Sequence, residues 1–264
     1  MQPTSDLYKS LFADLVAGKP GVRYETRMTI GDTGTLIDRK GNSITFGGVR
    51  ILVGSSGPDS GLDESKFISV KTALRVFSSD TPSVGDCVSS EIDVSLLQPA
   101  GTIPRQARLV PYVRLTDGPR HSEWLQQGVY FIDTRETSGS DSLKKMTLHG
   151  YDAMLKAEAD YPPSNLQWPA LDIDVVREIA ESMGVSVDAR TVAIMTRGCE
   201  IEYPADYSQR EVLGYIASLY AGCFVMSDLG ELRLVQLAGI PPETRYLITG
   251  DGQAITFGGV RIRV

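Results

Sequence analysis

Side chains that commonly carry out chemistry are sparse in this 264-residue chain. It has two histidines, His121 and His149, and neither has an acid or a second histidine at a metal-ligand spacing such as His-x-x-x-His. The sequence therefore predicts no metal site. We interpret His149, at the end of a predicted strand, as a structural or surface residue.

Motifs for nucleophilic and nucleotide chemistry are also missing from the sequence. The string closest to the hydrolase motif Gly-x-Ser-x-Gly, residues 57–61, has its serine one place late and is interpreted as a turn. Neither Gly-x-Gly-x-x-Gly after a strand nor Gly-x-x-x-x-Gly-Lys occurs, so we expect no nucleotide cofactor.

Two carboxylate pairs would suit glycoside hydrolysis, Asp172 with Asp174 and Asp63 with Glu64. Helix capping explains the first pair and a solvated loop explains the second. The sequence therefore predicts no catalytic residue and a protein that is not an enzyme.

The cysteines and tryptophans have similarly plain interpretations. Cys87, Cys199 and Cys223 lie far apart in the sequence, which indicates reduced, mostly buried thiols made in a cytosol rather than a disulfide framework. Trp124 and Trp168 are candidate platforms for stacking sugars, but we interpret them as loop anchors with a buried apolar body.

The charge balance indicates which partners the chain suits. Its 26 Lys and Arg against 33 Asp and Glu give a net charge of −7, the wrong sign for binding phosphates. A protein past which DNA slides would have this sign, because like charges prevent sticking. The N-terminus lacks the features of a signal peptide, and no apolar stretch reaches the roughly 18 residues of a membrane span. We expect a soluble protein with no membrane span.

The first half of the chain has the pattern of a β protein. Ser5 caps a predicted amphipathic helix that ends at Gly18. About eight short β-like runs separated by turn clusters then occupy residues 22–149, with no helix between them. Among them are residues 22–30, 66–77, 91–97, 107–115, 128–134 and 144–150. This pattern predicts a mainly antiparallel barrel or sandwich.

After Gly150 the pattern becomes helical. Asp152 caps a predicted short helix, and a proline-containing connection over residues 161–169 marks a domain boundary. A second helix begins near Asp172 or Asp174 and stops at Gly184. A third opens with the capping box of residues 208–211 and stops at Gly222, and a hairpin follows with its turn at 228–230. Together these elements form a small α+β unit.

A ten-residue element occurs twice: residues 44–53 and residues 255–264 are identical at nine of ten positions. A coincidental hairpin is one explanation. The other is that two domains of one fold stand in tandem, in which case the second copy is cut off at Val264 and the chain is a fragment of a longer natural protein. The residues of the element that are candidates for an assembly motif are Phe46, Gly47, Gly48, Arg50, Phe257, Gly258, Gly259 and Arg261.

Within this element the glycines are expected to supply the positive φ of a tight turn. Arg50 and Arg261 either pair with an acid on an adjacent domain or lie on the surface.

Several strings of the chain resemble the hub proteins of phage tails. They are residues 83–86, 90–94, 103–107, 122–125, 128–133 and 148–155, and residues 175–184 and 208–237 resemble the helical insertion of that family. The chain is identified as similar to prophage or siphophage tail-tip proteins of the baseplate-hub fold, which the spike proteins of type VI secretion share.

The resemblance implies an α+β fold: a mainly antiparallel β-barrel tube domain, a small α+β domain and the start of a second barrel. It also implies a homotrimer in which two related barrels per chain make a pseudo-sixfold ring that matches the tail tube. The implied domains are an N-terminal helix at 1–20, a barrel at 21–160, the small domain at 161–240 and the truncated second barrel at 241–264.

The implied function is that of a structural component joining the tail tube to the tip. Its partners would be a distal tail or tube protein and a tip or fibre, with DNA passing through the lumen without specific binding. It would be made in the host cytoplasm and end in the virion tail. The alternatives are a cell-wall-degrading tail-associated enzyme and a carbohydrate-binding module that uses Trp124 or exposed tyrosines.

Overall fold

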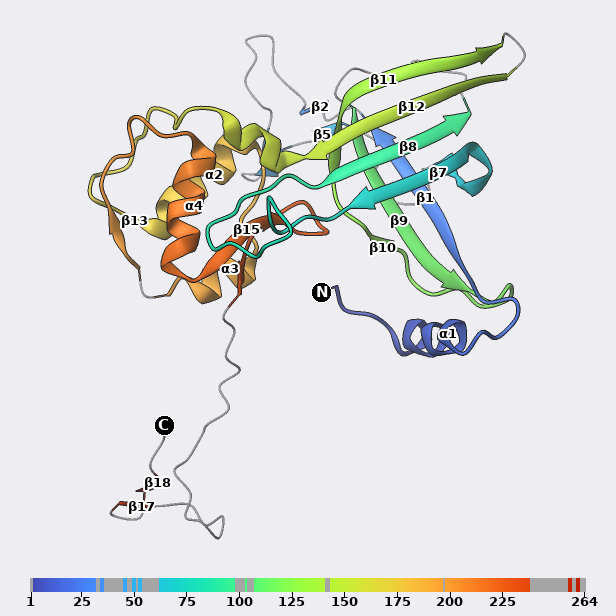
Figure 1. The fold of residues 1–264 in the computed structure, drawn as a ribbon, viewed down its shortest axis with the longest axis horizontal. Coiled ribbons are helices and arrows are strands. Elements are labelled where there is room, and N and C mark those ends of the chain that lie inside the picture. The colour runs from blue at the N-terminus through green and yellow to red at the C-terminus, as the bar shows by residue number, and fades with distance from the viewer. Residues whose placement is uncertain are drawn as a thin grey trace.

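The structure, a computed structural model, divides into a curled β-sheet and a helix-rich α+β unit (Figure 1). The structure describes residues 2–31, 62–97, 103, 107–140, 143–196 and 198–237. It also describes the backbones of six two-residue strands, at 34–35, 45–46, 49–50, 52–53, 256–257 and 260–261. None of the described helices is long and apolar enough to cross a membrane.

The main sheet has eight antiparallel strands in the order β6-β1-β9-β11-β12-β8-β7, with β10 paired to β9. The predicted α+β class and the antiparallel pairing are thus confirmed. The strands are β1 Arg23–Gly31, β6 Leu62–Asp63, β7 Phe67–Ala73, β8 Glu91–Leu97, β9 Arg108–Thr116, β10 Leu125–Gln126, β11 Tyr130–Ser140 and β12 Leu143–Asp152.

The two ends of this sheet are close together in the chain. Strands β6 and β7 stand at opposite ends of the strand order, yet only the short 3₁₀ helix η2, Glu64–Lys66, separates them in sequence. The sheet must therefore curl until its ends approach each other. Within the described residues no ladder joins the two ends, so a closed barrel is not found there.

Apolar side chains fill the inside of the curl. In β8 every second residue is buried, namely Ile92, Val94 and Leu96, as expected for a strand with one face on a core. They belong to a core cluster whose other members come from β1, β9, β11, β12 and the segment 103–107: Met28, Ile103, Ala107, Leu109, Tyr130, Ile132, Met146 and Leu148.

The remaining elements form α1 and the α+β unit. Helix α1 has the predicted Ser5 cap and buries Leu11. In chain order the elements are α1 Asp6–Val16, η3 Ala153–Glu158, β13 Ala170–Leu171, α2 Asp172–Met183, α3 Ala189–Ile194, β14 Glu200–Ile201, α4 Gln209–Leu219, β15 Gly222–Met226 and β16 Leu232–Gln236. Strands β13 and β14 pair, as do β15 and β16.

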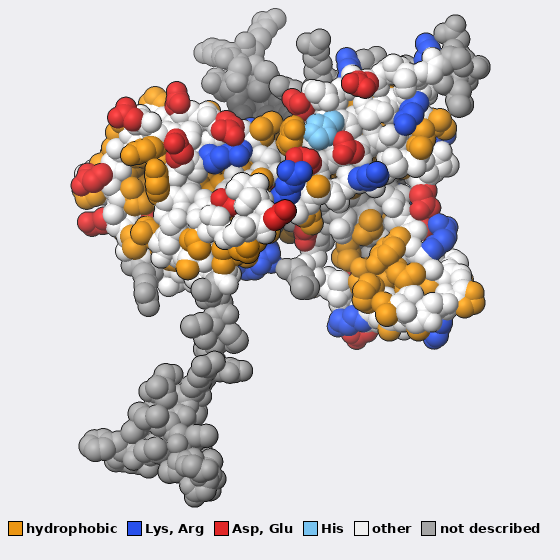
Figure 2. All heavy atoms as spheres, in the orientation of Figure 1, with side chains coloured by type: hydrophobic (Ala, Val, Ile, Leu, Met, Phe, Trp, Pro, Cys, Tyr) orange, Lys and Arg blue, Asp and Glu red, His pale blue; other side chains and the backbone are white. Residues whose placement is uncertain are grey.

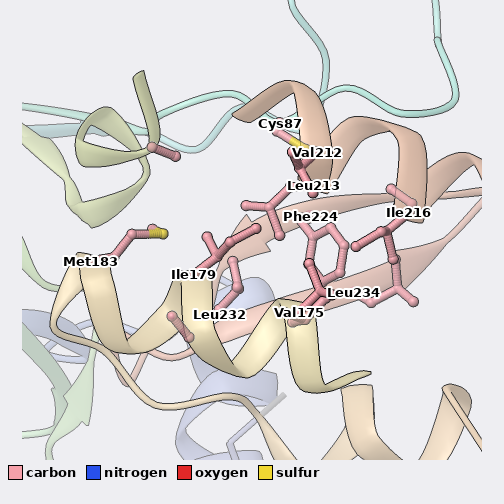
Figure 3. Close-up of a cluster of buried hydrophobic side chains, with 14 of the residues drawn as sticks. Cys87, Val175, Ile179, Met183, Val212, Leu213, Ile216, Phe224, Leu232 and Leu234 are labelled. Atoms are coloured by element: carbon pink, nitrogen blue, oxygen red, sulfur yellow. The ribbon is translucent and has the colours of Figure 1, made fainter. Parts of the chain in front are cut away.

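A second apolar core lies between α2, α4 and the β15–β16 hairpin (Figure 3). Ile179 of α2 and Leu213 of α4 are fully buried there against Phe224 of β15. Cys87 and three residues of η3 also enter this core. Burying each large apolar side chain is worth roughly 1.5–3 kcal/mol, so the packing of these faces accounts for the helices better than their intrinsic propensity does.

Local signals predicted some helix ends correctly and others wrongly. Gly184 takes the left-handed conformation (φ 76°) that ends α2, and Ser208 forms the predicted capping box with Glu211. The predicted stop of α4 at Gly222 is wrong. Ala221 has the positive φ (48°), whereas Gly222 opens β15, where a Cβ would lie 2.6 Å from the carbonyl oxygen of Val235.

The connection between β7 and β8 fixes the sheet to the α+β unit. The amide of Gly85 donates to the carbonyl of Gly222 (2.8 Å), and a Cβ on Gly85 would lie 2.5 Å from Ser218 Oγ and 2.9 Å from the carbonyl oxygen of Gly214. Only glycine allows the loop to approach α4 this closely.

A buried carboxylate joins the same two parts of the molecule. Asp152 at the end of β12 caps η3 by accepting from the amide of Met154 (2.9 Å), and it also accepts from the amide of Ser90 beside β8 (2.9 Å). It is 4% exposed. Burial raises the pKa of Asp152 to about 6, and the two amide bonds oppose that rise.

We expect Gly85→Ala to lower the free energy of unfolding by about 2 kcal/mol more than Gly118→Ala. Both glycines have positive φ, but a Cβ on Gly118 meets nothing within 4 Å. Urea denaturation of both variants measures the difference. Equal losses would contradict the close approach of the loop to α4.

Asp152 should make stability depend on pH between about 4 and 6. The pKa of Asp152 is higher in the folded than in the unfolded chain. Its contribution to the free energy of unfolding is therefore fully present below the unfolded-state pKa of 3.8 and is lost as pH rises through about 6. Between pH 4 and pH 6 the free energy of unfolding of the native chain should fall by about 3 kcal/mol relative to that of Asp152→Asn. A pH-independent difference between the two proteins would contradict the raised pKa.

Candidate assembly surface

The repeated element adopts the same hairpin at both of its positions. Strand β3, Thr45–Phe46, pairs with β4, Val49–Arg50, and strand β17, Thr256–Phe257, pairs with β18, Val260–Arg261. The register is also the same: Thr45 opposes Arg50 in one hairpin, and Thr256 opposes Arg261 in the other. The repeat is therefore one of backbone pairing as well as of sequence.

The predicted assembly residues are only partly described. The backbones of Phe46, Arg50, Phe257 and Arg261 lie in these strands. Their side chains lie outside the described residues, as do the four glycines of the two turns, at 47–48 and 258–259.

The edge strand β7 exposes apolar side chains. It pairs with β8 on one side, and no described residue pairs with its other side. Ile68, at the register shift between Phe67 and Ser69, is 54% exposed, and Leu74, just beyond the strand, is 64% exposed. A bulge re-aims a side chain, so Ile68 and Leu74 give this edge an apolar surface on which a neighbour could pack.

The sequence contained a sign that β7 carries apolar side chains on both of its faces. In the run from 66 to 77 apolar residues stand at both even and odd positions, which departs from the alternation of a strand with one buried face. Our prediction located the strand but did not use that departure.

A polar row crosses the outer face of the same strands. Lys71 of β7 and His149 of β12 both oppose Asp93 of β8, and His149 Nδ1 lies 2.7 Å from Asp93 Oδ1. Tyr151 packs edge-on against the imidazole at 4.8 Å between ring centroids. The surface interpretation of His149 agrees with this geometry. In the described part of the chain no three His, Cys, Asp or Glu side chains are grouped to hold a metal ion.

The carboxylate pairs have structural contacts, though not always the predicted ones. Asp172 does not cap α2, because Leu171 occupies the cap position; instead Asp172 is fully buried and accepts from the Tyr220 hydroxyl at the end of α4 (2.5 Å). Asp174 pairs with Arg177. Asp172 Oδ1 also accepts from the amide of Ile173 (2.7 Å), so this carboxylate does bond to a free amide in the first turn of α2. The capping interpretation was wrong in placing either carboxylate at the cap position itself.

The second pair is exposed to solvent as predicted, but it does not lie in a loop: Asp63 ends β6 and caps η2, and Glu64 is the first residue of η2. Asp63 accepts from the amide and hydroxyl of Ser65, and Glu64 pairs with Arg23. These hydrogen bonds lower the pKa of Asp63.

Trp124 anchors a cluster of charged side chains. The guanidinium carbons of Arg114 and Arg27 lie 4.4 and 5.1 Å from its ring centroid, and Arg114 also bonds to Glu25 (2.7 Å). Cation–π contacts occupy the ring surface that a sugar would need for stacking. The anchor interpretation therefore fits Trp124 better than a sugar platform does.

The cysteines are free, and two of the three are buried, in agreement with the prediction. Burial raises the pKa of the Cys87 thiol to about 12, which keeps it protonated and unreactive at neutral pH. Burial also raises the pKa of Cys223.

The negative charge is concentrated in one part of the molecule. Residues 151–237 contain 14 acidic and 6 basic residues, whereas the rest of the chain contains 19 and 20. Acidic side chains are seen at several points on the helical part in Figure 2, while the sheet displays both signs.

No protein-family model and no curated protein matches the sequence. Among solved structures, the 43 kDa tail protein of prophage MuSo2 from Shewanella oneidensis is 11% identical with a TM-score of 0.49, over 82% of this chain and 56% of that chain. The tail protein from Neisseria meningitidis MC58 is 12% identical with a TM-score of 0.43, over 80% of this chain and 51% of that one. This chain thus spans about half the length of the two tail proteins.

A chain of the lidded Francisella PdpA–VgrG complex is 9% identical with a TM-score of 0.44, over 86% of this chain and 30% of that chain. These solved structures are of the two kinds that the sequence analysis named, a phage tail protein and a VgrG-type spike protein.

Replacing Trp124 by Ala should cost about 1–2 kcal/mol of unfolding free energy, because two guanidinium groups lose their ring. Trp124→Phe, which keeps an aromatic face, should lose less. Urea denaturation measures both losses. Unchanged stability of Trp124→Ala together with loss of binding on a glycan array would instead favour a carbohydrate site.

Proposed function

We propose that the chain is a structural component of a phage or prophage tail tip, a hub protein that joins the tail tube to the tip. The observation that carries the proposal is the ten-residue element, which recurs in sequence and in the register of its hairpin. Duplicated domains are the simplest origin of such a repeat, and its role in a tail follows from the family that the sequence resembles.

In this proposal the curled sheet is the main part of a β-barrel tube domain at 21–160. The α+β unit at 161–240 is the helical insertion, and 241–264 holds the first strands of a second tube domain. The approach of β6 to β7 across Glu64–Lys66 supports the barrel. The two separate apolar cores support a division between sheet and helical unit.

The assembly in this proposal is a homotrimer. Two similar domains in each of three chains give six similar positions around one axis, which lets a threefold tip meet a sixfold tube. The exposed apolar residues of the β7 edge, Ile68 and Leu74, supply a contact between neighbouring chains.

The path for DNA lies between the chains rather than through the sheet. Apolar side chains such as Val94, Leu109 and Leu148 fill the inside of the curl, which leaves a polyanion no passage there. With 18 acidic and 16 basic residues, the proposed tube domain at 21–160 has no excess of cations to retain phosphates. This balance suits passage without specific binding.

The role is structural, carried by shape and strand pairing. The partners are a distal tail or tube protein on one side and a tip or fibre protein on the other. After synthesis in the host cytoplasm the protein is part of the virion tail. Immunogold electron microscopy of particles from an induced host should place antibodies against this chain at the tail tip, and particles without label there would contradict the proposal.

The trimer is tested with the native polypeptide in analytical ultracentrifugation. It should sediment at three times the monomer mass. Ile68→Asp combined with Leu74→Asp should weaken association at least tenfold, because two carboxylates would have to be buried at the contact.

The matched control is Val16→Asp on α1, a similarly exposed apolar residue at 73% that lies away from the β7 edge, and it should leave the trimer intact. A native monomer, or a trimer that survives the double substitution, would contradict the assembly proposed for this edge.

A further inference from the structure

An apolar groove of about 340 Å³ runs along the outer face of α4. One wall is α4 itself, with Tyr215, Leu219 and two partly or fully buried neighbours at helical spacing. The other wall is the segment 200–207, with Tyr203 and Tyr207. The three tyrosines and Leu219 are each 43–60% exposed, so the groove has an apolar lining that meets solvent.

The tyrosine rings are held in place by other rings. Tyr207 and Tyr215 meet edge to face, with centroids 5.4 Å apart and planes at 78°. Tyr203 packs in the same way on Trp168 (5.2 Å, 66°) and on Tyr161 (6.0 Å, 80°). The groove is therefore formed before any ligand arrives, which reduces the entropy cost of binding.

Steeply inclined rings select the shape of the ligand. A sugar stacks on a flat, open ring face, whereas rings in edge-to-face contact present a ridged wall to the groove. Proline side chains in an extended polyproline II segment pack against such aromatic-lined grooves, and this conformation is already preferred by the free peptide.

The negative charge at the groove favours a ligand with a basic residue beside its prolines. Glu200 and Glu202 line the groove, and neither has an ion-pair partner among the described residues. A guanidinium or ammonium group next to the prolines would pair with these carboxylates. The groove thus suits an extended segment that combines proline with Arg or Lys.

This chain carries one such segment shortly after strand β16. Residues 240–245, which lie outside the described residues, read Ile-Pro-Pro-Glu-Thr-Arg. The amide of Leu237 donates to the carbonyl of Ala221 (2.9 Å), and Ala221 follows the groove residue Leu219 by two positions. In the sequence, only residues 238 and 239 separate Leu237 from the segment.

We propose that this groove is the docking site of residues 240–245 of the same chain. The short connection gives the segment an effective concentration in the millimolar range, so even a weak peptide site would be occupied. Docking would fix the point at which the chain leaves the α+β unit. The inference goes beyond the tail function and does not depend on it.

The experiment uses the full chain and a fluorescein-labelled peptide with the sequence of residues 238–247. In the test variant, Pro241→Ala, Pro242→Ala and Arg245→Glu disable the chain's own segment. Fluorescence polarisation should show that this variant binds the peptide at least tenfold more tightly than the native chain, whose groove is occupied.

Adding Tyr215→Ala to the variant should weaken peptide binding at least tenfold. Adding Tyr24→Ala, at an exposed tyrosine of β1, should leave binding unchanged. Thermal unfolding of each variant verifies that it is folded.

Three results would overturn the proposal. The first is a folded test variant that does not bind the peptide. The second is equal binding by the native chain and the test variant, which would leave the groove to a segment of another protein. The third is a native self-association that the three substitutions abolish, which would assign the segment to a second copy. None of these results bears on the labelling of tail tips, so the two proposals fail separately.

Discussion

The ladder of β12 is the interaction on which the rest of the structure depends. Its residues pair with β11 along the full length of the strand and with β8 from Lys145 to Tyr151. Met146 and Leu148 point into the core of the sheet, and the strand then ends at Asp152, which caps η3. Gly150 is required within it, since a Cβ there would lie 2.5 Å from the carbonyl oxygen of Phe131. The same strand thus supplies the sheet core and leads directly into the helical core.

The sequence predicted the elements whose signals are local. The β-like run at 91–97 coincides with β8, and the capping box at Ser208 located the start of α4. Short elements were missed, such as α3 with its Asp188 cap and the β13–β14 pair, because two to six residues carry too little periodicity. Strand order was also beyond prediction, since pairing between distant segments leaves no local trace.

The candidate surfaces were predictable only in part, for a related physical reason. The repeat is visible by comparing the sequence with itself, so the candidate residues for assembly could be named directly. The role of Asp172 depends on Tyr220, which lies 48 residues away, and the groove needs Tyr203 and Tyr215 from two separate elements. Exposure of Ile68 results from a bulge that only the pairing of β7 with β8 creates. Sites assembled from distant residues require the tertiary structure.

The contact of Gly85 with α4 has a mechanical consequence. The loop that follows the edge strand β7 is fixed to the α+β unit by backbone atoms, through the bond to Gly222 and the close approach to Gly214. Backbone contacts cannot relax by rotamer changes, so Gly85 is a fixed anchor on α4. A pull on β7 would first extend residues 74–84, which follow the strand, and would then act on the helical unit at this anchor.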